Sequence, residues 1–276
     1  MITLATNLTA RVETPTMGDS PYLVDRDGAP YVPAATCGVV VGLRLGDGVF
    51  AHDADHAAPG VTLDHSDPAA RHALTAFACL GNRVVVRPGA AAGSVGAVLG
   101  KRGEAGRVIA VFDQDTLSRL APNDELLGRG SGQGATFANV TLRNTDPAML
   151  PALPLDAVGE RVLVGVRGRV PSEIVGNGIG RPAQMWDVDL QLTPDGSPAL
   201  RLGDLVCVDD LDVRHNVGYR RGWCTVGVVV HGGSPQPGHG PGVMPILCGP
   251  ADRFDIQCQP TDHVGVTAAD LGVADA

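Results

Sequence analysis

Two histidines in the C-terminal third of the chain flank a loop that is rich in glycine and proline. The apolar run Val226–Val230 predicts a buried strand that ends at His231, and His239 follows within the loop. Glycine allows positive φ angles and close approach of a ligand, whereas proline fixes the path of the turn. Because binding and catalytic side chains commonly stand on rigid loops, we expect both imidazoles to take part in chemistry. The alternative is a tight surface loop with two solvated histidines.

A second loop, residues 51–60, combines imidazoles with carboxylates. In it Asp55 directly precedes His56, a pairing in which the carboxylate could orient and polarise a general base. Imidazoles and carboxylates are also ligands of zinc, iron and manganese, so Asp53, His56 and His231 are candidate metal ligands. We predict that His56 and Asp55 meet the two histidines of the C-terminal loop in one catalytic site. A solvated acidic loop would explain the same residues.

Four further residues are candidates for binding a substrate. Gln133 lies among glycines and could help to hold an oxyanion. Lys101 is the one lysine among 21 basic residues and could act as an electrostatic or acid–base group, the alternative being a solvated turn lysine. Asp187 and Asp189 alternate along a predicted strand and could line a cleft, or could form its wet face.

The composition indicates which elements must position these residues. The chain has 276 residues, of which 44% are hydrophobic and only 4% aromatic, so Val, Leu, Ile and Ala must fill the core. Its 37 glycines and 21 prolines favour short elements joined by many turns. Strands are predicted over residues 37–45, 83–87, 107–112, 161–170, 185–192, 205–208, 226–230 and 244–247, and helical segments over 69–80 and 115–120.

These elements predict a mixed α/β, β-dominated fold in two lobes. Short strands with glycine at their corners favour a small β-barrel-like N-terminal lobe, residues 1–150. Residues 151–276 then form a C-terminal α+β lobe, rich in strands, that carries the histidine and glycine motif. The proline-rich residues 144–157 are the candidate linker. Residues 1–35 are expected to be irregular, and the last dozen residues to form a frayed tail.

Charge and hydropathy exclude several classes of partner. The net charge of −9 argues against nucleic-acid binding, which needs clustered basic residues. No apolar run reaches the roughly 18 residues of a membrane span, and the first residues lack the pattern of a signal peptide. We therefore expect a cytoplasmic protein, whose arginine-rich composition is typical of an actinobacterial genome. The six cysteines lack any CxxC spacing and are expected to be reduced core residues.

Several motifs together resemble one known family. They are Asp55–Val61, Gly89–Lys101, Gly132–Gly134 and the long segment from Gly227 through His231 to Gly242. In these segments the chain resembles the uncharacterised bacterial and archaeal family called domain of unknown function 4438, over roughly residues 22–255. The resemblance implies a two-lobed fold with a barrel-like N-terminal part and a homo-oligomer. It implies no settled reaction.

The candidate residues favour an enzyme that acts on a small polar metabolite. We expect hydrolysis or formation of an amide-type bond by His/Asp acid–base chemistry, with a divalent metal as an optional addition and no other cofactor. The layout is similar to that of acetamidase/formamidase proteins, which is an argument from analogy alone. One alternative is a cyclase or isomerase of specialised (natural-product) metabolism. Another is a non-catalytic protein that binds a ligand or serves as a scaffold.

Overall fold

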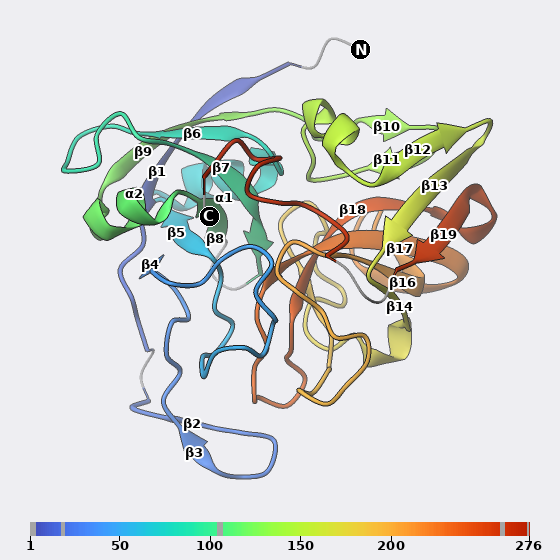
Figure 1. Cartoon of the computed structure of the whole chain (residues 1–276), viewed down its shortest axis with the longest axis horizontal. Helices are drawn as coiled ribbons and strands as arrows, with labels where there is room; N and C mark the ends of the chain where they lie inside the picture. The colour runs from blue at the N-terminus through green and yellow to red at the C-terminus, as the bar shows by residue number, and fades with distance from the viewer. Residues whose placement is uncertain (1–3, 18–19, 104–106, 260–262, 275) are drawn as a thin grey trace.

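Strands dominate the structure, a computed structural model that describes residues 4–17, 20–103, 107–259, 263–274 and 276 (Figure 1). Six strands of the N-terminal part close into a barrel: β1 (Thr6–Val12), β5 (Gly60–Asp64), β6 (Arg83–Val86), β7 (Val95–Arg102), β8 (Arg107–Val111) and β9 (Glu125–Gly130). They follow the order β1-β9-β6-β7-β8-β5, and pairing of β1 with β5 completes the ring. The β-dominated fold with a barrel-like N-terminal part is confirmed.

Strand β1 corrects the expectation that the first 35 residues are irregular. Its buried residues Leu8, Ala10 and Val12 alternate with exposed ones, which is the pattern of a strand with one face on the barrel interior. The strand expected over residues 37–45 is much shorter in the structure, where only β4 (Val39–Val40) is formed. The rest of that segment is a series of bends leading to the His56 loop.

Two short α-helices cover the barrel, and both begin at aspartate caps. In α1 (Pro68–Phe77), the side chain of Asp67 accepts a hydrogen bond from the Ala70 amide, and proline occupies the first helical position. In α2 (Gln114–Arg119), Asp113 accepts one from the Thr116 amide. Both helices lie where the hydrophobic spacing predicts them.

A second sheet forms the other main layer of the molecule. Its order is β10-β11-β18-β17-β16-β14, and β15 also pairs with β18. The strands are β10 (Thr136–Phe137), β11 (Val140–Leu142), β14 (Gly168–Pro171), β15 (Val188–Asp189), β16 (Leu205–Asp212), β17 (Gly218–His231) and β18 (Gly242–Pro250). Beside it, β12 (Leu155–Val158), β13 (Arg161–Val166) and β19 (Phe254–Cys258) form a three-stranded sheet. Short 3-10 helices occupy Pro147–Ala152, Ser172–Ile174 and Ala251–Arg253.

The barrel and the second sheet share a core along strand β7. Leu99 and Ile109 of the barrel belong to the same buried cluster as Val228 and Val230 of β17. A Cβ on Gly100 would lie 2.4 Å from a methyl carbon of Val230, so only glycine lets β7 approach β17 this closely. The end of β7 is thereby held next to the end of β17, where His231 stands.

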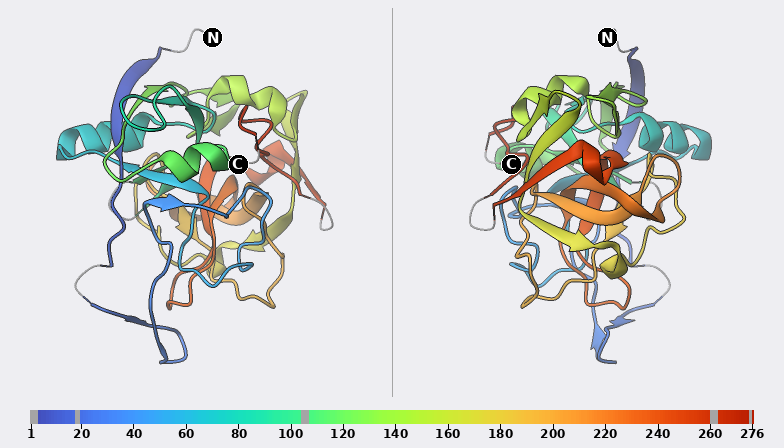
Figure 2. Two further views of the ribbon diagram at one scale, coloured as in Figure 1. Left: turned by 60° about the vertical axis from the view of Figure 1, so that its left-hand side comes forward. Right: turned by 90° about the vertical axis from the view of Figure 1, so that its right-hand side faces the viewer.

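A small hairpin extends from the body of the protein on the side of the β17–β18 loop (Figures 1 and 2). It consists of β2 (Leu23–Val24) and β3 (Pro30–Tyr31). Its turn is bound back to the molecule, because the Arg26 amide donates to the Pro235 carbonyl at 2.9 Å. We call the loop between β17 and β18, residues 232–241, the histidine loop. The hairpin lies beside this loop and contributes Tyr31 to its surroundings.

The C-terminal segment packs into the core, which corrects the expectation of a frayed tail. Leu271, Val273 and Ala276 are at most 5% exposed, and the Leu45 amide donates to the Ala276 carbonyl at 2.9 Å. Within the described residues, none of the helices has the length and apolarity needed to span a membrane.

Candidate metal centre

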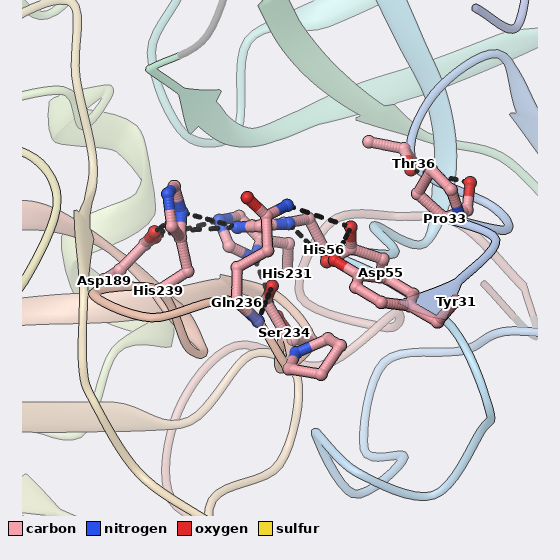
Figure 3. Close-up of polar contacts among 12 residues, drawn as sticks. Tyr31, Pro33, Thr36, Asp55, His56, Asp189, His231, Ser234, Gln236 and His239 are labelled. Carbon is pink, nitrogen blue, oxygen red and sulfur yellow. Dashed lines mark hydrogen bonds and ion pairs between the residues drawn. The ribbon is translucent and has the colours of Figure 1, made fainter. Parts of the chain in front are cut away.

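Three imidazoles and two carboxylates from distant parts of the chain meet at the end of the second sheet (Figure 3). We call the set His56, Asp187, Asp189, His231 and His239 the imidazole centre. His56 comes from the loop between β4 and β5, and His231 is the last residue of β17. Asp189 ends β15, and His239 lies in the loop between β17 and β18. All are buried except His239, whose side chain is 19% exposed.

One group of ligand atoms gathers around one oxygen of Asp189. His239 Nδ1 lies 2.8 Å from Asp189 Oδ2, and His56 Nε2 lies 3.6 Å from the same oxygen. The two ring nitrogens are 3.0 Å apart although 183 residues separate them in the chain. The proximity expected of His56 and His239 from the sequence is therefore present in the structure.

A second group gathers around the other Asp189 oxygen. His231 Nε2 lies 3.5 Å from Asp189 Oδ1 and 2.8 Å from Asp187 Oδ2. The His231 and His56 rings are neighbours, with centroids 5.1 Å apart. Asp187 is anchored by its other oxygen, which accepts a hydrogen bond from the Gly103 amide at 2.7 Å. Asp189 therefore stands between the two groups and belongs to both.

Backbone contacts explain why the His56 loop reaches the second sheet. The His56 amide donates to the Gly233 carbonyl at 2.9 Å, and the Gly232 amide donates to the Ala57 carbonyl at 2.8 Å. His56 itself has a φ of 51°, a left-handed conformation that is costly for a residue with a Cβ. The buried guanidinium of Arg102, at the end of β7, donates to the carbonyls of His56 and Thr36 and holds this conformation in place.

Because Gly242 has no side chain, the side chains of His231 and Asp187 can approach each other beside it. It pairs with His231 on one side and with Asp189 on the other, so it lies between the two residues. A Cβ at this position would stand 2.0 Å from His231 Nε2 and 2.4 Å from Asp187 Oδ2. No residue other than glycine is compatible with this arrangement of side chains.

The outer side of the centre is built from Asp55 and two polar neighbours. Asp55 Oδ1 lies 2.7 Å from His56 Nδ1, while its Oδ2 accepts hydrogen bonds from Tyr31 (3.1 Å) and Gln236 (3.4 Å). The row from Asp189 through the imidazoles to Asp55 and Tyr31 is visible in Figure 3. A carboxylate behind a ligating imidazole is a common way to orient the ring of a metal ligand.

The carboxylates and imidazoles shift each other's protonation. Burial acts to raise the pKa of Asp189, yet its contacts with His231, His239 and His56 hold that pKa well below its usual range. Burial acts to lower the pKa of His231, but Asp187 and Asp189 raise it to about 10. Burial also acts to raise the pKa of Asp55, which the adjacent His56 lowers to about 2. The carboxylates are thus stabilised in their ionised form, and their charge stabilises a positive charge between them.

The donor atoms could hold a metal ion. Two sets have this geometry among the described residues: His56, Asp189 and His239, and Asp187, Asp189 and His231. The buried oxygens Asp187 Oδ2 and Asp55 Oδ1 lie 2.8 and 2.7 Å from imidazole nitrogens, but neither contact has hydrogen-bond geometry in the part of the chain that the structure describes. Imidazole nitrogen with carboxylate oxygen suits zinc, iron or manganese. Asp187 and Asp189, which the sequence predicted to bind substrate, are therefore candidate metal ligands.

Other predicted residues lie elsewhere. Asp53, a predicted metal ligand, is exposed. Lys101 and Gln133 do not hydrogen-bond to any member of the centre within the described residues. Instead both bind the side-chain oxygen of the buried Asn144, at 2.9 and 2.7 Å. We call Lys101, Gln133 and Asn144 the lysine cluster. Because the Gln133 amide is used there, the predicted oxyanion role of Gln133 finds no support.

A cavity of about 700 Å³ lies next to the centre, between the β2–β3 hairpin and the histidine loop. Its lining includes Tyr31, Ala54 and Ser234, which are neighbours of Asp55 and His56, as well as the exposed Asp53. The three histidines of the centre, His56, His231 and His239, do not line the cavity. Polar contacts connect the cavity with the centre: Tyr31 donates to Asp55, the neighbour of His56, and the His56 amide donates to the carbonyl of Gly233 in the cavity lining.

Sequence reasoning missed two residues on which the centre depends, Arg102 and Gly242. The signal for Arg102 was an arginine in an otherwise apolar barrel strand, next to the lone lysine. The signal for Gly242 was a glycine at the point where a buried strand starts, directly after Pro241. Neither pattern alone distinguishes a role at a site from a role in folding.

Comparisons with known proteins identify the family and a related structure. Residues 22–151 match the model described as domain of unknown function (DUF4438), N-terminal, and residues 152–266 match the corresponding C-terminal model. No curated protein matches the chain. A solved structure described as "Crystal structure of TM1086" is 30% identical, with 95% of each chain covered and a TM-score of 0.90. The chain belongs to the DUF4438 family.

Proposed function

We propose that this protein is a metal-dependent hydrolase that cleaves an amide-type bond in a small polar molecule. The observation that carries the proposal is the convergence of His56 Nε2, His239 Nδ1 and Asp189 Oδ2 within 2.8–3.6 Å of one another. Two imidazoles and one carboxylate are a common donor set of catalytic zinc, which leaves a coordination position open for water. No lysine or arginine side chain pairs with Asp189 among the described residues, so its charge is available to a cation.

The reaction adds one water across the bond. Its oxygen joins the carbonyl carbon, the C–N bond breaks, and a proton passes to the leaving nitrogen, which gives a carboxylic acid and an amine. When bound, a divalent cation would supply a water of lowered pKa and polarise the carbonyl. His56, oriented by Asp55 on its far nitrogen, would hold the ion together with His239 and Asp189. The partial exposure of His239 gives the centre its contact with solvent.

The neighbouring cavity supports a small substrate. Its volume of about 700 Å³ falls within the usual range for small-molecule sites. Backbone groups of the histidine loop and the side chains of Arg26 and His52 line it, so it offers hydrogen bonds as well as charge. A ligand there would lie against Tyr31, whose hydroxyl already contacts Asp55.

The proposal is tested by activity with defined metals. The protein is stripped with a chelator, reloaded with Zn²⁺, Mn²⁺, Fe²⁺ or Co²⁺, and incubated with a panel of small primary amides and N-formyl or N-acetyl amino acids. Release of ammonia or amine is measured. We expect hydrolysis that depends on added metal, and a fall of roughly 10²–10⁴-fold in His239→Ala.

A matched variant separates this effect from the loss of any histidine. His72 is exposed on helix α1, so His72→Ala should retain full activity. The melting temperature of the metal-free His239→Ala protein should stay close to that of the parent. Turnover that survives both chelation and the His239 substitution would contradict the proposal. Rearrangement of a panel compound without uptake of water would instead favour a cyclase or isomerase.

A further inference from the structure

The two oxygens of Asp189 face two separate sets of ligand atoms. Oδ2 faces His239 and His56 at 2.8 and 3.6 Å, and Oδ1 faces His231 at 3.5 Å. His231 is in turn 2.8 Å from Asp187. A carboxylate that presents one oxygen to each of two donor sets has the geometry of a bridging ligand, because each oxygen can bind a different ion.

The hydrogen-bonding of the imidazoles shows which of their nitrogens carry lone pairs. His231 Nδ1 lies 2.8 Å from the Gly232 carbonyl, which can only accept, so this nitrogen carries the proton. The lone pair of the neutral ring is then on Nε2, which faces two carboxylate oxygens. His56 Nδ1 likewise faces the Asp55 carboxylate, which leaves its Nε2 lone pair directed at the first set. In both sets a ring nitrogen faces a carboxylate oxygen, and a cation can take the place of the proton between them.

The distances fit metal coordination in both sets. Ligand bonds of about 2.0–2.2 Å place neighbouring donors roughly 2.8–3.6 Å apart at octahedral or tetrahedral angles. The separations measured from Asp189 and His231 all lie between 2.8 and 3.6 Å. Asp187 supplies a further sign of a ligand: it is 3% exposed, and its Oδ2, although 2.8 Å from His231 Nε2, forms no contact of hydrogen-bond geometry among the described residues.

The charges agree with two ions. Asp55, Asp187 and Asp189 bring three negative charges, and no lysine or arginine side chain forms an ion pair with them among the residues described. Two dications together with these three carboxylates and one hydroxide are neutral. Two neighbouring ions would stabilise both the attacking and the leaving group of a hydrolysis.

We propose that the imidazole centre binds two divalent ions bridged by Asp189, one held by His56 and His239 and the other by His231 and Asp187. The inference rests on the metal-dependent function proposed above and adds the second ion and the bridge. In such sites the two ions lie about 3.5–4 Å apart. Gly242 has a specific part in this arrangement, because its missing side chain leaves the room beside His231 and Asp187.

The experiment counts ions and tests whether they are neighbours. Chelator-treated full-length protein is dialysed against Mn²⁺, its metal content per chain is measured by mass spectrometry, and its electron paramagnetic resonance spectrum is recorded. We expect two Mn²⁺ per chain with the spectrum of an exchange-coupled pair. Asp187→Asn should retain one Mn²⁺ with an uncoupled spectrum, and Asp53→Asn, which alters an exposed carboxylate, should retain the coupled pair.

Several outcomes would overturn the bridge. They are one Mn²⁺ in the parent protein, two uncoupled ions, or a coupled pair that survives Asp187→Asn. A stepwise Co²⁺ titration of the parent, followed by visible absorption, keeps the test decisive if the variant does not fold, because one binding step contradicts two sites. Ion counting does not require turnover. A coupled pair without amide hydrolysis would leave the inference intact and defeat the proposed function, whereas hydrolysis with a single ion would do the reverse.

Discussion

Lys101 and His231 are both at most 1% exposed, but their neighbours differ in kind. Lys101 Nζ donates to the carbonyls of Ala76 (3.3 Å) and Gln184 (2.6 Å) and to the Asn144 side chain (2.9 Å), so each proton of the ammonium group has an acceptor. His231 Nε2 lies 2.8 Å from Asp187 and 3.5 Å from Asp189, so one ring nitrogen is shared by two carboxylates. Donors that each have their own acceptor form a structural cluster, while imidazoles and carboxylates that converge on one point form a site that a metal ion can occupy.

The comparison suggests a general criterion for buried polar groups. In the sequence, the lysine cluster and the imidazole centre share one feature: their charged residues lie in apolar or glycine-rich segments. Only the second has donor groups that could hold a metal ion. The two regions should therefore respond differently to substitution: changes in the lysine cluster should affect folding, and changes in the imidazole centre should affect metal binding.

The largest effect on stability is expected for Asn144→Ala. The Asn144 side chain takes part in four hydrogen bonds, accepting from Lys101 and Gln133 and donating to the carbonyls of Ala183 and Pro245. Its loss should lower the free energy of unfolding by about 2–4 kcal/mol in urea, because buried partners are left unsatisfied. The metal content per folded chain should not change; a loss of metal would break the distinction between the two regions.

A matched control removes the contribution of backbone strain. Asn144 has a φ of 51°, and the exposed Asn123 has a φ of 73°. The loss of stability in Asn123→Ala thus measures the cost of placing alanine in the left-handed region, because no buried side-chain hydrogen bond is lost there. An equal loss of stability in both variants would show that the hydrogen bonds of Asn144 contribute little.

The next effect concerns Asp55→Asn. An asparagine oxygen cannot match the charge of the carboxylate behind His56, so affinity for Zn²⁺ should fall about 10–100-fold. Competition with a chromophoric chelator measures this directly. Asp53→Asn, two residues away and exposed, should leave the affinity unchanged. Equal affinities in all three proteins would show that Asp55 does not orient a ligand.

A third effect is a pH dependence of stability that belongs to Lys101. Burial lowers its pKa from 10.5 to about 7, with Cys79 acting to raise it and Arg143 to lower it. Between these pH values the unfolded chain binds more protons than the folded one, so the free energy of unfolding rises with pH. The slope of the free energy of unfolding with pH is at most about 1.4 kcal/mol per pH unit. It falls to zero below pH 7, where the lysine is protonated in both the folded and the unfolded chain.

This slope is measured as a difference between two proteins. Urea unfolding of the parent and of Lys101→Met is compared from pH 7.5 to 9.5, so that titration of His231 and other shared groups cancels. The parent should gain stability relative to the variant as the pH rises. Arg83→Met, which alters an exposed cation on β6, should show no such trend. Parallel curves for the parent and Lys101→Met would mean that the lysine stays charged throughout this range.

The sequence predicted the elements better than it predicted which polar groups would meet. Hydrophobic spacing located helix α1 and the buried strands β8 and β17, because that information is local. The rigid loop around His239 indicated a site for the same reason. The partners of Lys101 could not be read from the chain, since three carbonyl-type acceptors from distant segments determine its role.

Short strands were the least predictable elements. The alternation of Asp187 and Asp189 suggested a strand over residues 185–192, but only Val188–Asp189 pair with β18. Their position beside Gly242 follows from the register of that pairing, which no local pattern records. For the same reason the proline-rich residues 144–157, expected to be a linker, contain the buried Asn144 and a strand, β12.

The span of 183 residues between His56 and His239 has a consequence for the order of events during synthesis. A ribosome adds about 5–20 residues per second, so roughly 10–40 s pass between translation of the two histidines. All six barrel strands precede residue 131, so the barrel can close while the carboxylates and imidazoles of the second sheet are still missing. His56 has no contact with His231 or His239 until the β17–β18 hairpin has been synthesised and has left the ribosome. Its positioning by Arg102, a barrel residue, can nevertheless be ready in advance.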